Sequence, residues 1–197
     1  MPWAFCLVIF GILNKLDFMK TLIIVLTLVS NVVLAKTVNP QGNFVRSCYE
    51  DDTDFLASVI TIENANWTFT HTGYEDESCA KPYIIYEEKF SAVIDGTHLD
   101  LQATEASYTT LTDTVTEALN MIAYCGFQDW KTGEKKTVTD MICDDYAPPR
   151  VGETRFTIFQ VSEDGSTLAL GKKSFGNEGT SSERRHKEVG SDHYIKN

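Results

Sequence analysis

The stretch WTFTHT at residues 67–72 alternates large apolar or aromatic side chains with threonines. A period of two predicts a half-buried β-strand, because successive side chains of a strand point to opposite faces of its sheet. The preceding run at 59–62 is rich in β-branched residues, and the turn-forming segment 64–66 separates the two runs. The sequence therefore predicts a β-hairpin over residues 59–72.

A second hairpin follows directly along the chain. Residues 83–94 form another long run rich in β-forming residues, and Asp95-Gly96 is a strong signal for a two-residue turn. After the turn, apolar and polar residues alternate again up to Ala103. We expect an antiparallel pair over residues 83–104.

The carboxyl-terminal third contains further strand patterns. Residues 156–161 carry apolar groups on both faces, which predicts a strand covered on both sides, and the turn 163–166 leads into a return strand at 167–170. The polar tail 178–192 predicts a loop, followed by a last short strand at 193–195.

One segment has a helical period instead. From Thr114 the apolar residues fall at positions i, i+3, i+4, i+7 and i+8 of one helix face. Thr114 and Glu117 fit a capping box, and Gly126 is placed to supply the left-handed residue that ends a helix. We predict a single helix that plugs or covers the sheet. The stripe consists of Val115, Ala118, Leu119, Ile122 and Ala123.

About eight β segments, one helix and no βαβ alternation predict an all-β fold, in which an antiparallel sheet curls into an up-and-down barrel. A barrel of this size can hold one small ligand. A length of 197 residues suits one domain, and a net charge of −11 argues against binding to nucleic acid.

The amino terminus has the pattern of a signal peptide over residues 1–35. Met19-Lys20 begins a short basic region, residues 21–34 are apolar, and residues 33–35 suit a signal peptidase. We therefore expect export to a periplasmic or extracellular location and a single mature domain over 36–197. Residues 1–18 are interpreted as a start codon assigned too early, with a retained membrane anchor as the alternative.

Four cysteines follow the signal peptide, and an even number in an exported domain predicts two disulfides. The favoured pairs are Cys48–Cys79 and Cys125–Cys143, because each closes a short loop between neighbouring elements. Zinc is the alternative, but the spacings contain no C-x-x-C knuckle.

Several motifs together resemble a known family. They are Gly42 to Cys48, Trp67-x-Phe69, Tyr74-x-Asp76-x-x-Cys79 and Tyr124-Cys125-Gly126-Phe127-x-x-Trp130. This pattern resembles small exported bacterial proteins related to the APC-down-regulated (APCDD) family of lipocalin-like β-barrels, and it covers most of residues 40–195. Phe44 stands where the lipocalin pattern has Trp. The resemblance implies a lipocalin-like barrel and, from the animal members, extracellular binding of a lipid-modified signalling protein.

No motif predicts an enzyme, a cofactor or a metal centre. The sequence has no G-x-S-x-G elbow, and its histidines show no H-x-x-x-H or H-E-x-x-H spacing. His71, His98, His186 and His193 are therefore predicted as surface residues of strands or loops. The acidic segments 50–54 and 75–77 leave calcium open as an alternative to solvated loops.

Aromatic residues on the two hairpins suggest where a ligand would lie. We expect Trp67, Phe69, Tyr86 and Phe90 either to fill the barrel or to line its cavity, and we predict them as the ligand-facing residues. The function predicted is that of an exported, non-enzymatic binding protein for an apolar small molecule, a lipid or acyl group, or an envelope protein partner. The alternative is a structural or adhesive envelope protein with a filled barrel; an enzyme of unrecognised type ranks third.

Charge also constrains the ligand. Without residues 1–35 the net charge is −12. A fatty acid anion would approach against this field unless Arg46 or Lys89 lies at the mouth, so a neutral or zwitterionic ligand is favoured.

Overall fold

Nine β-strands form one antiparallel sheet in the computed structural model, which describes residues 39–52, 54–144 and 146–197. The predicted signal peptide at 1–35, including its possible early start, lies outside the described residues. The strands are β1 (Gly42–Asp51), β2 (Asp54–Glu63), β3 (Asn66–Tyr74), β4 (Pro82–Asp95), β5 (His98–Thr110), β6 (Lys135–Thr137), β7 (Thr154–Val161), β8 (Thr167–Lys172) and β9 (Glu188–Lys196).

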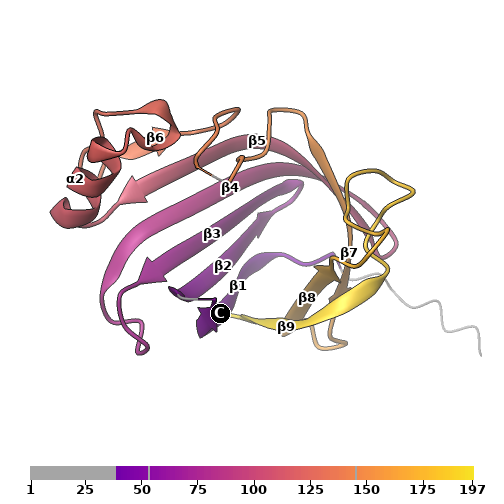
Figure 1. Ribbon diagram of the computed structural model, residues 1–197. Coiled ribbons are helices and arrows are strands. Elements are labelled where there is room, and N and C mark those ends of the chain that lie inside the picture. Colours follow the sequence, from indigo (N-terminus) through magenta and orange to yellow (C-terminus); the bar gives the residue numbers. More distant parts are fainter. Residues whose placement is uncertain (1–38, 53, 145) are drawn as a thin grey trace, which may run out of the picture. The chain divides into compact units, whose positions relative to one another are not determined.

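Eight of these strands close into a barrel (Figure 1). Each of β1 to β5 pairs with the next, β5 pairs with β7, and the chain continues through β8 and β9 back to β1. The short strand β6 pairs with the end of β5, outside the ring. The predicted all-β, antiparallel barrel of eight strands is confirmed.

Both predicted hairpins are present. Register pairs join Ile62 to Trp67 across the β2–β3 turn and Asp95 to His98 across the β4–β5 turn. Gly96 has a φ of +60°, a left-handed conformation that glycine adopts without steric cost. The Asp-Gly signal therefore identified the turn correctly.

The last strand is longer than predicted. The tail 178–192 was expected to be a loop, but β9 begins at Glu188, because Glu188 and Val189 pair with Lys172 and Gly171 of β8. Backbone pairing with β8 stabilises this segment as a strand in spite of its polar composition.

The rest of that tail, residues 173–187, is a loop that lies along β7. The Phe156 N–H donates to the Gly179 carbonyl at 2.9 Å, and the His186 N–H donates to the Phe156 carbonyl at 3.3 Å. The Arg185 guanidinium lies 5.4 Å from the centre of the Phe156 ring. This cover agrees with the apolar residues predicted on both faces of β7.

The helix α2 (Asp113–Met121) lies close to its predicted position, but its cap differs. Thr112 is the N-cap, and its hydroxyl accepts a hydrogen bond from the Val115 N–H at 3.3 Å. The capping box predicted at Thr114 and Glu117 was wrong by two residues. Thr112 has the extended backbone conformation that an N-cap requires.

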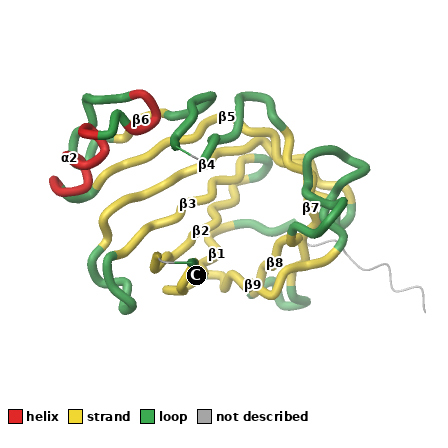
Figure 2. The backbone as a smooth tube through the Cα atoms, viewed as in Figure 1, coloured by secondary structure: helices red, strands yellow, loops and turns green. Residues whose placement is uncertain are grey.

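The helix covers less of the sheet than predicted. Thr116 is its buried residue, whereas Ala118 and Ile122 of the predicted stripe are exposed. Ala123, with a φ of 52°, takes the first left-handed conformation after the helix, ahead of Gly126. Figures 1 and 2 show α2 beside the carboxyl end of β5, so the helix does not plug the barrel.

Apolar side chains fill one end of the barrel. Trp67 has no exposed surface, and its ring lies 6.2 Å from Phe69 and 6.4 Å from Phe159, measured between ring centroids. Phe69 meets Phe90 edge to face at 5.5 Å. The buried members of this cluster are Phe44, Ile60, Ile62, Trp67, Phe69, Phe90, Ala92, Leu99, Leu101, Ala103, Phe159, Leu168 and Tyr194.

Both predicted disulfides are confirmed. Cys48 of β1 is bonded to Cys79 in the β3–β4 connection, and Cys125 after the helix is bonded to Cys143 in the loop before β7. Two disulfides indicate an oxidising location outside the cytoplasm. Among the helices of the described residues, none combines the length and hydropathy needed to cross a membrane.

Removing one disulfide should lower stability without abolishing the fold. The bridges span 31 and 18 residues, and loop closure in the unfolded chain makes each worth about 3–4 kcal/mol. We expect the double variant Cys48→Ala, Cys79→Ala to unfold at a lower urea concentration and to keep the β-type circular dichroism spectrum. Free thiols in the parent under non-reducing peptide mapping would contradict the pairing.

Trp67 and its neighbour Thr68 provide a matched test of the filled core. Trp67→Ala should cost about 3–5 kcal/mol of unfolding free energy, because the packed neighbours leave a cavity. Thr68, on the opposite face of β3, is only partly buried, and Thr68→Ala should change this free energy by less than about 0.5 kcal/mol. Equal losses in urea unfolding would show that Trp67 is not a core residue.

Candidate functional site

The interior changes from apolar to polar along the strands. On β2 the inward positions run from Ile62 and Ile60 to Ser58, and on β4 they run from Phe90 to Glu88. The same alternation brings further polar side chains inward on β1, β3 and β7, and on β5 a register shift between Ala103 and Glu105 brings Tyr108 to the inner face. The polar members are Arg46, Ser58, His71, Tyr86, Glu88, Tyr108 and Arg155.

A buried carboxylate lies at the centre of this polar half. Glu88 is only 4% exposed, and its Oε1 accepts hydrogen bonds from the Tyr86 hydroxyl at 3.0 Å and the Tyr146 hydroxyl at 3.2 Å. The Arg155 Nη2 lies 3.5 Å from the same oxygen. A buried charge is costly unless it is paired and hydrogen-bonded, so these three donors make the position of Glu88 tolerable.

The two phenols remain protonated under physiological conditions. Burial, and then the charge of Glu88, raises the pKa of Tyr146 to about 12, and the same two causes raise the pKa of Tyr86 still further. The hydroxyls lie 2.7 Å from each other. Two protons are therefore shared among two phenol oxygens and one carboxylate oxygen.

A second polar chain runs across β1, β2 and β3. The Tyr49 hydroxyl lies 2.8 Å from Ser58 Oγ, which lies 2.7 Å from His71 Nδ1. The His71 ring stacks on Tyr86 with centroids 6.4 Å apart, which links this chain to the Glu88 cluster. Burial lowers the pKa of His71, against the opposing effect of Glu88, and this favours the neutral imidazole.

Neither of the two cations considered for the mouth of the barrel, Arg46 and Lys89, is free to bind an anionic ligand. Arg46 forms an ion pair with Asp192 at 2.9 Å and lies over the Tyr49 ring at 3.5 Å. Lys89 forms ion pairs with Glu105 at 3.1 Å and Glu87 at 3.7 Å. Both cations are therefore neutralised within the barrel wall.

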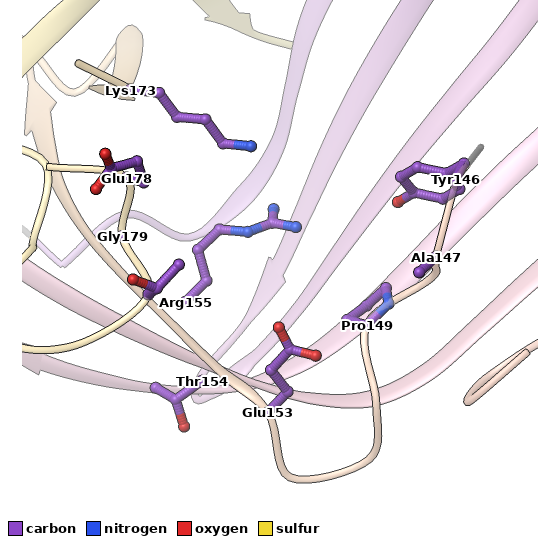
Figure 3. A pocket seen from close by; sticks show the side chains of 10 residues that line it. Tyr146, Ala147, Pro149, Glu153, Thr154, Arg155, Lys173, Glu178 and Gly179 are labelled. Atoms are coloured by element: carbon purple, nitrogen blue, oxygen red, sulfur yellow. The ribbon is translucent and has the colours of Figure 1, made fainter. Parts of the chain in front are cut away.

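A hollow of about 240 Å³ opens beside the polar half. Figure 3 shows the side chains of Arg155 and Lys173 pointing into this space, with Tyr146 on the opposite side and Glu178 directed away. Arg155 and Tyr146 also bind Glu88, so the hollow adjoins the buried carboxylate. Its lining consists of Tyr146, Ala147, Pro149, Glu153, Thr154, Arg155, Lys173, Glu178, Gly179 and Thr180.

The predicted ligand-facing residues do not form one group. Trp67, Phe69 and Phe90 lie together in the packed apolar end, whereas Tyr86 belongs to the polar half. None of the four lines the 240 Å³ hollow. Their role as ligand contacts stays a prediction.

Sequence reasoning missed Glu88, Tyr146 and Arg155. The period-two pattern of β4 contains the signal for Glu88, because Glu88 lies two residues before the inward-facing Phe90. Arg155 likewise shares a face of β7 with Phe159. Tyr146 lies in a loop without a periodic pattern, so nothing local indicated its contact with Glu88.

Two of the four histidines were predicted wrongly as surface residues. His71 is inside the barrel, and His186 is only 4% exposed, with its Nδ1 2.9 Å from Thr157 Oγ1. Gly171 makes room for His186, because a Cβ at position 171 would lie 2.7 Å from the His186 Cβ. His98 and His193 are exposed, as expected.

The described residues contain no group of three or more His, Cys, Asp or Glu side chains arranged to hold a metal ion. Within the acidic segment 75–77, Asp76 accepts hydrogen bonds from the backbone N–H groups of Ser78, Ala80 and Lys81 at 3.1, 3.2 and 2.8 Å. Hydrogen bonds to Ser78 and to this backbone lower the pKa of Asp76. Its carboxylate therefore organises the β3–β4 connection.

The lowered pKa of His71 predicts an acid-sensitive fold. Below its ordinary value of 6.5, the unfolded state binds a proton that the folded state resists, so stability falls as the pH drops. We expect His71→Gln to weaken this fall in urea unfolding between about pH 5 and 7.5. His98→Gln is the control, because His98 is exposed. An unchanged pH dependence in His71→Gln would contradict the prediction.

No protein-family model matches the sequence, and the search of curated proteins finds no match either. The resemblance to the APCDD family therefore stays a prediction.

Proposed function

We propose that this protein is an exported, non-enzymatic binding protein that holds a small polar molecule at the polar end of its barrel. The observation that carries the proposal is the division of the interior. One end is filled with apolar side chains, and the other combines a buried carboxylate, cations, phenols and a hollow. Convergent polar groups beside a cavity are typical of a ligand site.

The geometry changes the chemistry of the ligand proposed from the sequence. An acyl chain would need apolar space, but Trp67, Phe69 and Phe90 pack against one another there. The hollow of about 240 Å³ is also smaller than the roughly 300–1,000 Å³ of typical sites for drug-sized ligands. A small polar ligand therefore suits the barrel better than a lipid.

The non-enzymatic part of the proposal rests on Ser58 and His71. Their contact of 2.7 Å resembles that of a nucleophile and its base. Ser58 is only 1% exposed, however, and its hydroxyl is also held by Tyr49 at 2.8 Å. A substrate has no access to an oxygen buried in this way, which favours a role in positioning the imidazole.

Export is supported by the signal-peptide pattern at 1–35 and by the two disulfides. A second candidate function is that of a structural or adhesive envelope protein without a ligand. The specific observation in its favour is the filled apolar end of the barrel.

Blocking the hollow tests the proposal. The full chain would be expressed with export, and the purified product would be denatured and extracted with methanol for mass spectrometry of polar molecules and lipids. We expect a small polar molecule to be recovered from the parent. Ala147→Trp should reduce its recovery at least tenfold, because Ala147 lines the hollow.

Ala118→Trp is the matched control, because Ala118 is exposed on α2 away from the hollow lining. It should leave the recovery unchanged. A stoichiometric lipid in the parent would restore the acyl ligand predicted from the sequence. Recovery of neither class, together with no binding of small polar molecules in calorimetry, would favour the structural protein.

A further inference from the structure

Most N–H groups of the Arg155 guanidinium have no hydrogen-bond acceptor among the described residues. A guanidinium carries five N–H donors, but the one ion pair of Arg155 among the described residues is the 3.5 Å contact with Glu88. The Arg155 side chain remains 39% exposed. Figure 3 shows its end directed into the hollow, where it can receive a further acceptor.

Lys173 supplies a second cation to the same space. It is exposed, lines the hollow and forms no ion pair with any described residue. Its neighbour Lys172 differs, because its ammonium forms an ion pair with Glu188 at 3.0 Å and lies outside the hollow lining. The two adjacent lysines therefore have different environments.

Each acid in or beside the hollow has at least one hydrogen-bond or ion-pair donor. Glu178 forms an ion pair with Arg184 at 2.6 Å, and Glu153 accepts a hydrogen bond from the Arg150 N–H at 3.1 Å. Glu88 receives its three donors on one oxygen. These carboxylates would repel a ligand with two negative charges, so a singly charged anion fits the site better than a phosphate dianion.

We infer that the molecule held in this hollow is a small monocarboxylate, with its carboxylate bound by Arg155 and Lys173 and its apolar body against Tyr146, Ala147 and Pro149. This inference rests on the proposed binding function and adds the chemical class of the ligand. The planar guanidinium matches a carboxylate in two-point geometry, and the lysine adds a point charge.

The size of the hollow agrees with this class. A water occupies about 30 Å³ of liquid, so the hollow of about 240 Å³ has room for roughly eight non-hydrogen atoms. The Tyr146 side chain lies on the far side of the space from Arg155, where its ring can contact the apolar body of the ligand (Figure 3). A planar ring with one carboxylate, such as benzoate, has suitable dimensions.

The test compares benzoate with benzamide, its neutral counterpart of the same shape, by calorimetric titration of the exported protein. We expect saturable binding of benzoate and at least tenfold weaker binding of benzamide. Lys173→Gln and Arg155→Gln should each weaken benzoate binding at least tenfold, which corresponds to about 1.4 kcal/mol. Lys172→Gln removes the same charge one residue away and should leave the affinity unchanged.

Each contrary outcome overturns the inference. Equal binding of benzoate and benzamide would show that the hollow binds a ligand but does not recognise its carboxylate. An equal loss of benzoate affinity in Lys172→Gln would show that Lys173 acts through the net charge of the protein and not through contact with the ligand. No binding of benzoate would also reject the inferred class, whereas the proposed function is judged separately by the Ala147→Trp recovery. Because exposed Lys173 has no structural partner among the described residues, its variant remains informative if Arg155→Gln fails to fold.

Discussion

The pairing of β1 with β9 closes the barrel, and the rest of the structure depends on it. The seam is short: Phe44 and Val45 pair with Lys196 and Ile195. Beyond it, the Asn197 N–H donates to the Asn43 carbonyl at 2.9 Å. Closure leaves the eight strands of the ring without a free edge and creates a single interior, into which every second side chain of each strand points.

That interior cannot be uniform, because its inward-facing residues differ between the two ends. The apolar end is stabilised by burial of aromatic and aliphatic side chains, which need no specific partner. The polar end depends on hydrogen bonding, because Glu88 is buried and would be costly without donors. Its donors come from β4, β7 and the loop that contains Tyr146, so the carboxylate ties that loop to the barrel wall.

The loop at 173–187 shapes the hollow in a similar way. It pairs through its backbone with β7, buries His186 against Thr157 and brings Lys173 and Gly179 to the lining. This packing needs small residues at two positions. A Cβ at Gly171 or Gly179 would lie within 2.8 Å of a His186 side-chain atom. The irregular segments therefore contribute as much to the lining of the hollow as the strands do.

Much of the fold could be predicted from the sequence, because its signals are local. The alternation at 67–72 and the Asp95-Gly96 turn predicted hairpins that are present, and the spacing of the cysteines favoured the two pairs that form. The helix was also located, although its cap was not. The extent of β9 was missed, because the polar start of that strand is stabilised by pairing with β8 and has no alternating pattern of its own.

By itself, the sequence determined where most of the strands lie and that these strands need a shared apolar interior. Only the tertiary structure decided that Trp67, Phe69 and Phe90 fill one end, and that Glu88 meets Tyr146 and Arg155 at the other. The physical reason is separation along the chain. Tyr146 and Arg155 lie 58 and 67 residues from Glu88 along the chain. The three side chains meet through the register of a closed barrel and the path of an irregular loop, neither of which leaves a periodic pattern.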